Sequence, residues 1–207
     1  MLEEIINELQ KTEHGFKHIE EAGKNILEDK QSDILPIALE LLGNETYQAR
    51  MLGTFLLGQL AAENEQALQA LKSIVATDPN WRVQEMLAKA FDYYCSRIGY
   101  EASLAEIKTW LLHENPNLNR AAVEGLRIWT SRPYFKEHPQ IAIGLIAQLK
   151  GSESEYVRKS VGNALRDISK KHGALVAQEL LHWDLTDKRV AYTQKLVTKN
   201  QKLGRSA

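Results

Sequence analysis

The chain has 207 residues, of which 43% are hydrophobic and 26% are charged, and its formal net charge is −1. This composition supplies enough apolar surface for a packed core and excludes a disordered chain. The single cysteine, Cys95, excludes an intramolecular disulfide and a cysteine zinc cluster. The sequence shows no signal-peptide pattern and no run of about 18 apolar residues, so we expect a cytoplasmic protein without membrane contact.

The charges are distributed unevenly along the chain. Residues 1–75 carry 6 Lys or Arg and 13 Asp or Glu, whereas residues 76–207 carry 20 and 14. The net charges of these two parts are therefore −7 and +6. Such an asymmetry favours a polyanionic partner for the second part, although total charge carries no information about the fold.

Apolar residues recur at helical spacing along nearly the whole chain, and no alternating β pattern occurs. Turn-forming residues separate the helical stretches, as at Asp78-Pro79-Asn80 and Asn115-Pro116-Asn117. The fold class predicted from this pattern is all-α. The expected helices are 2–12, 16–29, 33–42, 45–63, 65–76, 80–97, 101–113, 117–130, 139–149, 154–171, 173–182 and 187–201.

The turns also introduce a repeat, in which an aromatic or apolar residue starts a helix and an arginine follows. Its copies are Asn44–Arg50, Pro79–Arg82, Pro116–Arg120 and Ser154–Arg158. A period of about 38 residues with two helices indicates HEAT or armadillo-like repeats, and therefore an α-solenoid with a concave face. We expect one curved domain over 1–207, with capping helices in 1–43, repeats in 44–200 and a frayed tail in 201–207.

Three helices of the repeats carry polar residues four positions apart, which places each pair on one helix face. The pairs are Trp81 with Glu85, Arg120 with Glu124, and Asn163 with Asp167. If the helices stack in register, these faces line one groove. Basic residues on the same helices would form its rim: Arg82, Arg127, Arg158, Lys159, Arg166, Lys170 and Lys171.

A structural interpretation of the same residues remains open. Ion pairs at this spacing occur on any solvated helix and contribute only about 0.3–0.5 kcal/mol. Glu85 could pair with Lys89, and Asp167 with Lys171. Trp81, near a helix start, could pack between repeats rather than bind a ligand.

Three segments resemble the HEAT-like-repeat DNA glycosylases of the bacterial DNA alkylation repair family: Asn80–Phe91, Asn117–Arg127 and Glu155–Lys170. The resemblance covers about residues 40–185. It looks closer to the AlkC branch than to the AlkD branch, because the motif at Arg120, Glu124 and Gly125 and the pattern from Arg158 to Asp167 are AlkC-like. The Trp81–Glu85 pair is common to both branches. Asn163 replaces a tryptophan of the AlkD branch, and Arg127–Pro133 replaces a proline-rich run of the AlkC branch.

The resemblance implies hydrolysis of the N-glycosidic bond of cationic alkylated bases, such as 3-methyladenine or 7-methylguanine, in duplex DNA. Trp81, with Trp129 as a second candidate, would bind the cationic base. Glu85 would have the central catalytic role, supplemented by Glu124 and Asp167. The remaining contacts to substrate and DNA phosphates would come from Arg120, from Asn163 and from the basic rim.

Two other functions remain open. The two departures from the family pattern favour a member that binds DNA structure without cleaving it, and a HEAT-type protein adaptor is a third hypothesis. His14 and His18 lack a third ligand, so we expect no metal. Without a glycine-rich nucleotide motif we expect no cofactor, and we expect a monomer that associates with the nucleoid when it binds DNA. Cys95 is expected to be a buried core thiol.

Overall fold

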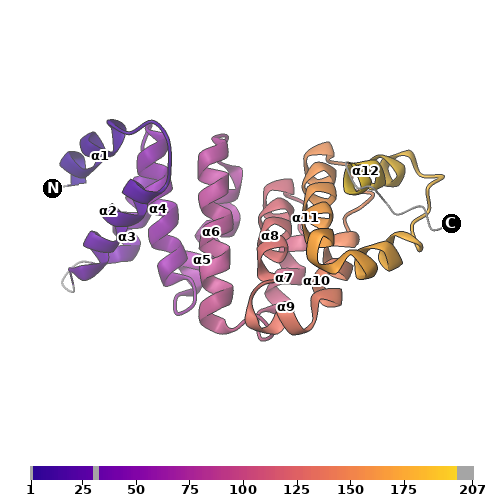
Figure 1. The fold of residues 1–207 in the computed structure, drawn as a ribbon. Coiled ribbons are helices and arrows are strands. Elements are labelled where there is room, and N and C mark those ends of the chain that lie inside the picture. The colour runs from indigo at the N-terminus through magenta and orange to yellow at the C-terminus, as the bar shows by residue number, and fades with distance from the viewer. Residues whose placement is uncertain (1, 30–32, 200–207) are drawn as a thin grey trace. The chain divides into compact units, whose positions relative to one another are not determined.

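The structure, a computed structural model, describes residues 2–29 and 33–199. These residues form twelve α-helices and one 3₁₀ turn without any strand, which confirms the predicted all-α fold class (Figure 1). None of the described helices is both long and apolar enough to cross a membrane. Contacts between Cα atoms divide the chain into two compact units, Met1–Gly99 and Tyr100–Ala207.

Unit 1 is organised around α4, which packs against α2, α3, α5 and α6. Other helices cover α4 on more than one side, and nine of its fourteen residues are buried. The core of this unit includes Leu52, Leu56, Met86 and Phe91, all fully buried. The helices of unit 1 are α1 (Leu2–Gln10), α2 (Lys17–Glu28), α3 (Ile34–Leu42), α4 (Tyr47–Leu60), α5 (Glu65–Ser73) and α6 (Trp81–Ile98), with the 3₁₀ turn η1 at Val75–Thr77.

Unit 2 is organised around α11, which packs against α8, α10 and α12. Its core includes Trp110, Leu126, Trp129 and Leu165. The helices of unit 2 are α7 (Leu104–Leu111), α8 (Pro116–Trp129), α9 (Pro133–Glu137), α10 (Pro139–Ala147), α11 (Glu155–Leu180) and α12 (Lys188–Thr198).

The predicted helix boundaries agree with the structure at most positions, with one exception. The short helix α9 was not predicted, because five residues are too few for a periodic apolar pattern to emerge. The predicted break between helices 154–171 and 173–182 is confirmed by a kink in α11, where His172 has non-helical φ and ψ angles. The predicted tail, 201–207, lies outside the described residues.

The repeat is visible in the contacts of two arginines at equivalent helical positions. Arg50 in α4 and Arg158 in α11 are both the fourth residue after their N-cap. In both, Nη1 donates to the backbone carbonyls five and six residues earlier in the chain. Each guanidinium therefore fastens the turn that precedes its own helix.

Candidate functional site

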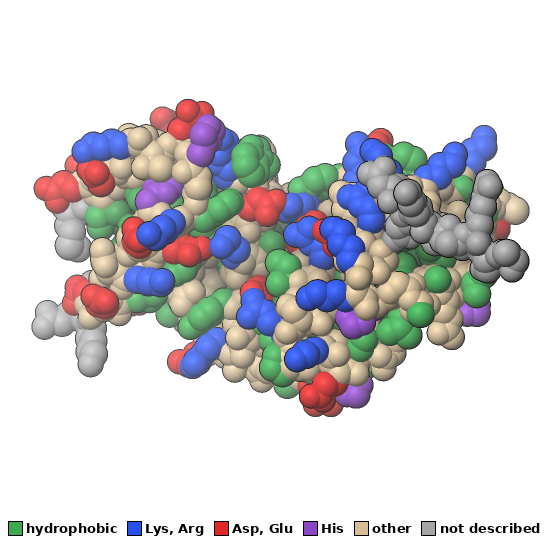
Figure 2. Space-filling view, viewed as in Figure 1, with side chains coloured by type: hydrophobic (Ala, Val, Ile, Leu, Met, Phe, Trp, Pro, Cys, Tyr) green, Lys and Arg blue, Asp and Glu red, His purple; other side chains and the backbone are tan. Residues whose placement is uncertain are grey.

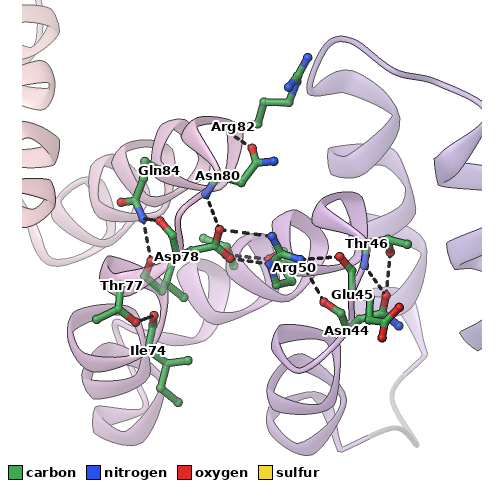
Figure 3. A network of polar contacts seen from close by, with 12 residues as sticks. Asn44, Glu45, Thr46, Arg50, Ile74, Thr77, Asp78, Asn80, Arg82 and Gln84 are labelled. Atoms are coloured by element: carbon green, nitrogen blue, oxygen red, sulfur yellow. Dashed lines mark hydrogen bonds and ion pairs between the residues drawn. The ribbon is translucent and has the colours of Figure 1, made fainter.

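The start of α6 is held by a polar network in the preceding turn (Figure 3). The carboxylate of Asp78 pairs with Arg50, and its Oδ1 accepts a hydrogen bond from the backbone N–H of Asn80 at 2.7 Å. The Asn80 side chain in turn caps α6 by accepting from the N–H of Arg82 at 2.9 Å. Gln84 donates to the carbonyls of Val75 and Asp78. These bonds attach the first turn of α6 to the turn that precedes it and, through Asp78 and Arg50, to α4.

This fixed turn presents the first candidate pair. Trp81 is the first residue of α6, and 58% of its surface is exposed. Glu85 lies one helical turn further on the same helix and is partly buried. Lys89 bonds Glu20 of α2, with Nζ 2.8 Å from Oε1. Trp81 and Glu85 both belong to unit 1, and so does Arg82.

The other two candidate carboxylates, Glu124 and Asp167, meet in unit 2 around one arginine. Arg127 of α8 contacts Glu124 on its own helix, with Nη2 3.0 Å from Oε2, and Asp167 of α11, with Nη1 3.1 Å from Oδ2. Lys170 pairs with the second oxygen of Asp167 at 2.8 Å. The side chains of Glu124 and Asp167 are 16% and 33% exposed. We call these four residues the Arg127 cluster.

The cluster favours the ionised form of one acid. The hydrogen bond from Lys170, reinforced by Arg127, lowers the pKa of Asp167 below the usual carboxyl value of 3.8, although partial burial opposes this shift. A carboxylate with a lowered pKa is a weak proton acceptor. Its chemical use is therefore electrostatic, since it keeps a negative charge at neutral pH.

The remaining substrate-binding candidates of unit 2 make contacts that the sequence did not reveal. The Arg120 guanidinium lies over the ring of Tyr156, 5.4 Å from its centroid, and Tyr156 is 43% exposed. Asn163 accepts a hydrogen bond from Arg166 at 2.8 Å. Glu124, which the spacing places on one helix face with Arg120, is bonded by Arg127.

Trp129 cannot serve as a second base-binding indole in this structure, which corrects that expectation. Its side chain is fully buried. Its ring stacks on Phe135 and contacts Tyr100, with centroids 5.9 and 5.3 Å away. Gly125, one turn earlier, lies under the same ring. The aromatic face is therefore used for packing within unit 2.

The seven residues of the predicted basic rim make different contacts. Figure 2 shows Lys and Arg side chains over the helices of unit 2, with acidic side chains among them. Two arginines of the predicted rim are already engaged, since Arg127 lies between two carboxylates and Arg158 is bonded to turn carbonyls. The others are distributed as follows: Lys159 bonds Glu155, Arg166 reaches the Leu196 carbonyl, Lys170 bonds Asp167, Lys171 is exposed, and Arg82 belongs to unit 1.

Sequence reasoning missed the aromatic partners of the arginines. Tyr47 lies under Arg82 and Tyr156 under Arg120. The available signal was the repeat itself, because Tyr47 and Trp81 occupy the same position, the first residue of α4 and of α6.

The comparisons with known proteins identify the relatives of this chain. Residues 16–180 match the family model described as "DNA alkylation repair enzyme". The crystal structure of AlkD2 from Streptococcus mutans is 45% identical, with a TM-score of 0.88, and the match covers 98% of this chain and 100% of that one. The structure of smu.31 from Streptococcus mutans UA159 is 44% identical, with a TM-score of 0.86, and covers 96% and 98%.

A more distant match corrects the expected branch. The alkylpurine DNA glycosylase AlkC of Pseudomonas fluorescens, solved bound to DNA containing an abasic site analog, is 19% identical with a TM-score of 0.65, over 88% of this chain and 52% of that one. That likeness shows the fold alone, and the expectation of a closer likeness to AlkC than to AlkD is wrong. The AlkC-like motifs are short, and spacings of four residues recur on many helices of a repeat protein.

A curated relative is the uncharacterized protein YhaZ of Bacillus subtilis (strain 168), 32% identical over 123 residues. The match covers 58% of this chain and 32% of YhaZ, so the chain spans about a third of that relative.

Proposed function

Because this chain belongs to the DNA alkylation repair enzyme family, we propose that it binds duplex DNA and excises cationic alkylated bases of the 3-methyladenine or 7-methylguanine type. The observation that carries this proposal is the pair on α6, an exposed indole at Trp81 with the Glu85 carboxylate one turn later. Duplex DNA as the substrate implies that the protein acts at the nucleoid, and we expect it to act as a monomer.

The chemistry of the substrate explains why these two residue types suffice. Alkylation at N3 of adenine or N7 of guanine leaves the base cationic, which weakens its bond to the sugar. An indole face attracts a cation by about 0.5–2 kcal/mol, depending on desolvation. Glu85 would stabilise the positive charge that develops on the sugar and orient a water molecule toward C1′, the atom at which the bond to the base breaks.

The phosphates of the DNA would be bound by cations of unit 2, whose residues 100–207 carry 17 Lys or Arg against 11 Asp or Glu. Arg120 is oriented by the Tyr156 ring beneath it, and Lys171 is exposed on α11. Neutralising phosphates releases counterions, so the affinity for DNA should fall steeply as salt rises. Glu124 and Asp167 would supplement Glu85 electrostatically.

A second candidate function is recognition of DNA structure without excision. The observation that favours it is the Arg127 cluster, in which one arginine contacts both Glu124 and Asp167. Pairing with a guanidinium balances part of a carboxylate's negative charge, so Glu124 and Asp167 would stabilise a sugar cation only weakly.

The experiment that tests the proposal is release of 3-methyladenine and 7-methylguanine from methylated duplex DNA. We expect release by the wild-type chain above the rate in buffer, and a Glu85→Gln variant about 100-fold slower, as for the loss of one electrostatic catalytic group. The matched control is Glu65→Gln, which removes an exposed acid from the first turn of α5. We expect this control to release base at the wild-type rate.

Two outcomes separate the hypotheses. Equal background release by the wild type and Glu85→Gln, with salt-dependent binding of duplex DNA, contradicts excision and leaves the second candidate. DNA affinity that does not change between low and high salt contradicts both DNA functions. That last result would favour the protein adaptor.

A further inference from the structure

Two aromatic residues at equivalent positions of neighbouring helices share one cation in unit 1. Tyr47 is the first residue of α4, and Trp81 is the first residue of α6, which packs against α4. The Arg82 guanidinium carbon lies 5.0 Å from the ring centroid of Tyr47 and 4.6 Å from that of Trp81. Both distances are within the range of cation–π attraction.

The loop between α1 and α2 holds this arrangement in place. Nη2 of Arg82 is 3.0 Å from Nδ1 of His14. The hydroxyl of Tyr47 donates to the carbonyl of Glu13 at 2.7 Å. Both the cation and one of its rings are therefore tied to two consecutive residues of one loop. Arg82 is drawn at the start of α6 in Figure 3, where its guanidinium extends away from the turn network.

Helical register explains why Arg82 does not bond the turn before its helix, as Arg50 and Arg158 do. Arg50 and Arg158 are four residues after their N-caps and turn back to the preceding carbonyls. Arg82 is only two residues after Asn80, so its side chain leaves the helix about 200° away from theirs. That direction leads to the aromatic rings instead of the turn.

The occupied rings have the chemistry that a cationic base requires. A delocalised planar guanidinium and a protonated or alkylated purine are both flat cations that stack on aromatic faces. Trp81 is the exposed indole among the four tryptophans, since Trp110, Trp129 and Trp183 are at most 6% exposed. A ligand that stacks on the ring face covered by Arg82 must first displace it.

We infer that Tyr47 and Trp81 form a binding site for a flat aromatic cation and that Arg82 is its internal occupant, held by His14. The site takes an alkylated purine only after Arg82 has left. The choice of this ligand rests on the proposed function, whereas the presence of a cation site rests on the contacts of Arg82 alone. Arg82 thus sets the affinity of the site for its ligand.

The test is binding of 7-methylguanosine, with neutral guanosine as the matched ligand, measured by quenching of tryptophan fluorescence in the full chain. A Trp81→Phe variant gives the signal of the three buried tryptophans. Replacing Arg82 with Gln removes the occupying charge, and we expect 7-methylguanosine to bind about three- to thirty-fold tighter than to the wild type, as expected for one cation–π contact. Guanosine should show no such gain.

Three further variants control this result. Arg82→Lys keeps a cation and should give an intermediate gain, and His14→Ala loosens Arg82 and should give a smaller gain than Arg82→Gln. Arg97→Gln removes another cation of α6, which is 55% exposed and paired with Glu63, and should leave binding unchanged. Equal or weaker binding of 7-methylguanosine by Arg82→Gln than by the wild type, with the helical circular dichroism intact, overturns the inference.

The outcome is independent of the excision experiment. If Arg82→Gln binds 7-methylguanosine more tightly while neither protein releases base from DNA, the cation site stands and excision does not. If base is released by the wild type while Arg82→Gln shows no gain for the nucleoside, excision stands and the role given to Arg82 is wrong.

Discussion

The two units of the molecule use arginine–carboxylate pairs in contrasting surroundings. In unit 1 the pair of Arg50 and Asp78 is shielded, with side chains only 17% and 9% exposed. In unit 2 the pair of Arg127 and Asp167 is half-open, at 35% and 33%. The first pair also bonds backbone groups of the turns around it, whereas the second bonds other charged side chains.

This difference distinguishes an ion pair that stabilises the fold from one that a ligand can reach. A shielded pair bonded to backbone fixes a turn and has little capacity left for a ligand. A half-open cluster with alternating charges keeps its field accessible, so an approaching phosphate can compete for its cations. The two units also differ in net charge, which is −7 for residues 1–99 and +6 for residues 100–207.

Breaking the shielded pair should have the largest effect on stability. We expect Asp78→Ala to lower the free energy of unfolding by about 3 kcal/mol, because Arg50 keeps its charge without its partner and the N–H of Asn80 loses its acceptor. Urea unfolding followed by circular dichroism measures the change. Glu45→Gln, in the neighbouring turn and exposed, should stay within about 0.5 kcal/mol. Equal midpoints for the two variants would contradict the structural role of the pair.

Two glycines of unit 2 test the difference between a packed and an open helix face, because one has no room for a side chain and the other has. A Cβ at Gly125 would lie 2.5 Å from Cζ2 of Trp129, so we expect Gly125→Ala to lower stability by about 1–3 kcal/mol. A Cβ at Gly144 of α10 meets no atom within 4 Å, so Gly144→Ala should raise stability by about 0.5–1 kcal/mol. Thermal unfolding of both variants compares the signs, and a stabilised Gly125→Ala would show that the Trp129 ring is free to move.

The smallest effect is expected at Asp167 in the half-open cluster. Lys170 and then Arg127 lower the pKa of this carboxyl, so its ion pairs stabilise the fold above the unfolded pKa of about 3.9. This stabilisation is lost as pH falls from there through the lower folded pKa. We expect Asp167→Asn to be less stable than wild type at pH 7 by under about 1 kcal/mol. The two urea midpoints should converge at acidic pH, where this carboxyl is protonated in both the folded and the unfolded state, and a gap that persists there would assign the effect to packing.

Much of the fold could be predicted from the sequence because its signals are local. Apolar spacing predicted the helices, and turn residues predicted where they begin, since Asn80, Asn115 and Ser154 cap α6, α8 and α11 with their side chains. The repeated turn motif predicted helix pairs of the HEAT type. Only the five-residue α9 carried too little periodicity to be found.

The candidate site was predicted less completely because side-chain partners are not local. The bond between Glu124 and Arg127 and the position of Arg120 over Tyr156 were not predicted from the spacing. Trp129 has a side chain of the type that binds cationic ligands, but it is buried in the core. Which face of a helix is covered depends on the helix that packs against it, and no pattern within one segment records that.

The sequence by itself determined the helices, the repeat and the family, because these depend on backbone propensity and on motifs that lie close together along the chain. The tertiary structure alone decided what each charge and each ring contacts. Arg50, Arg82, Arg120 and Arg158 look alike in the repeated motif. They differ in their distance from the N-cap, and at about 100° per residue that distance aims Arg50 and Arg158 at backbone carbonyls and Arg82 and Arg120 at aromatic rings. Arg158 also lies over the ring of Tyr192.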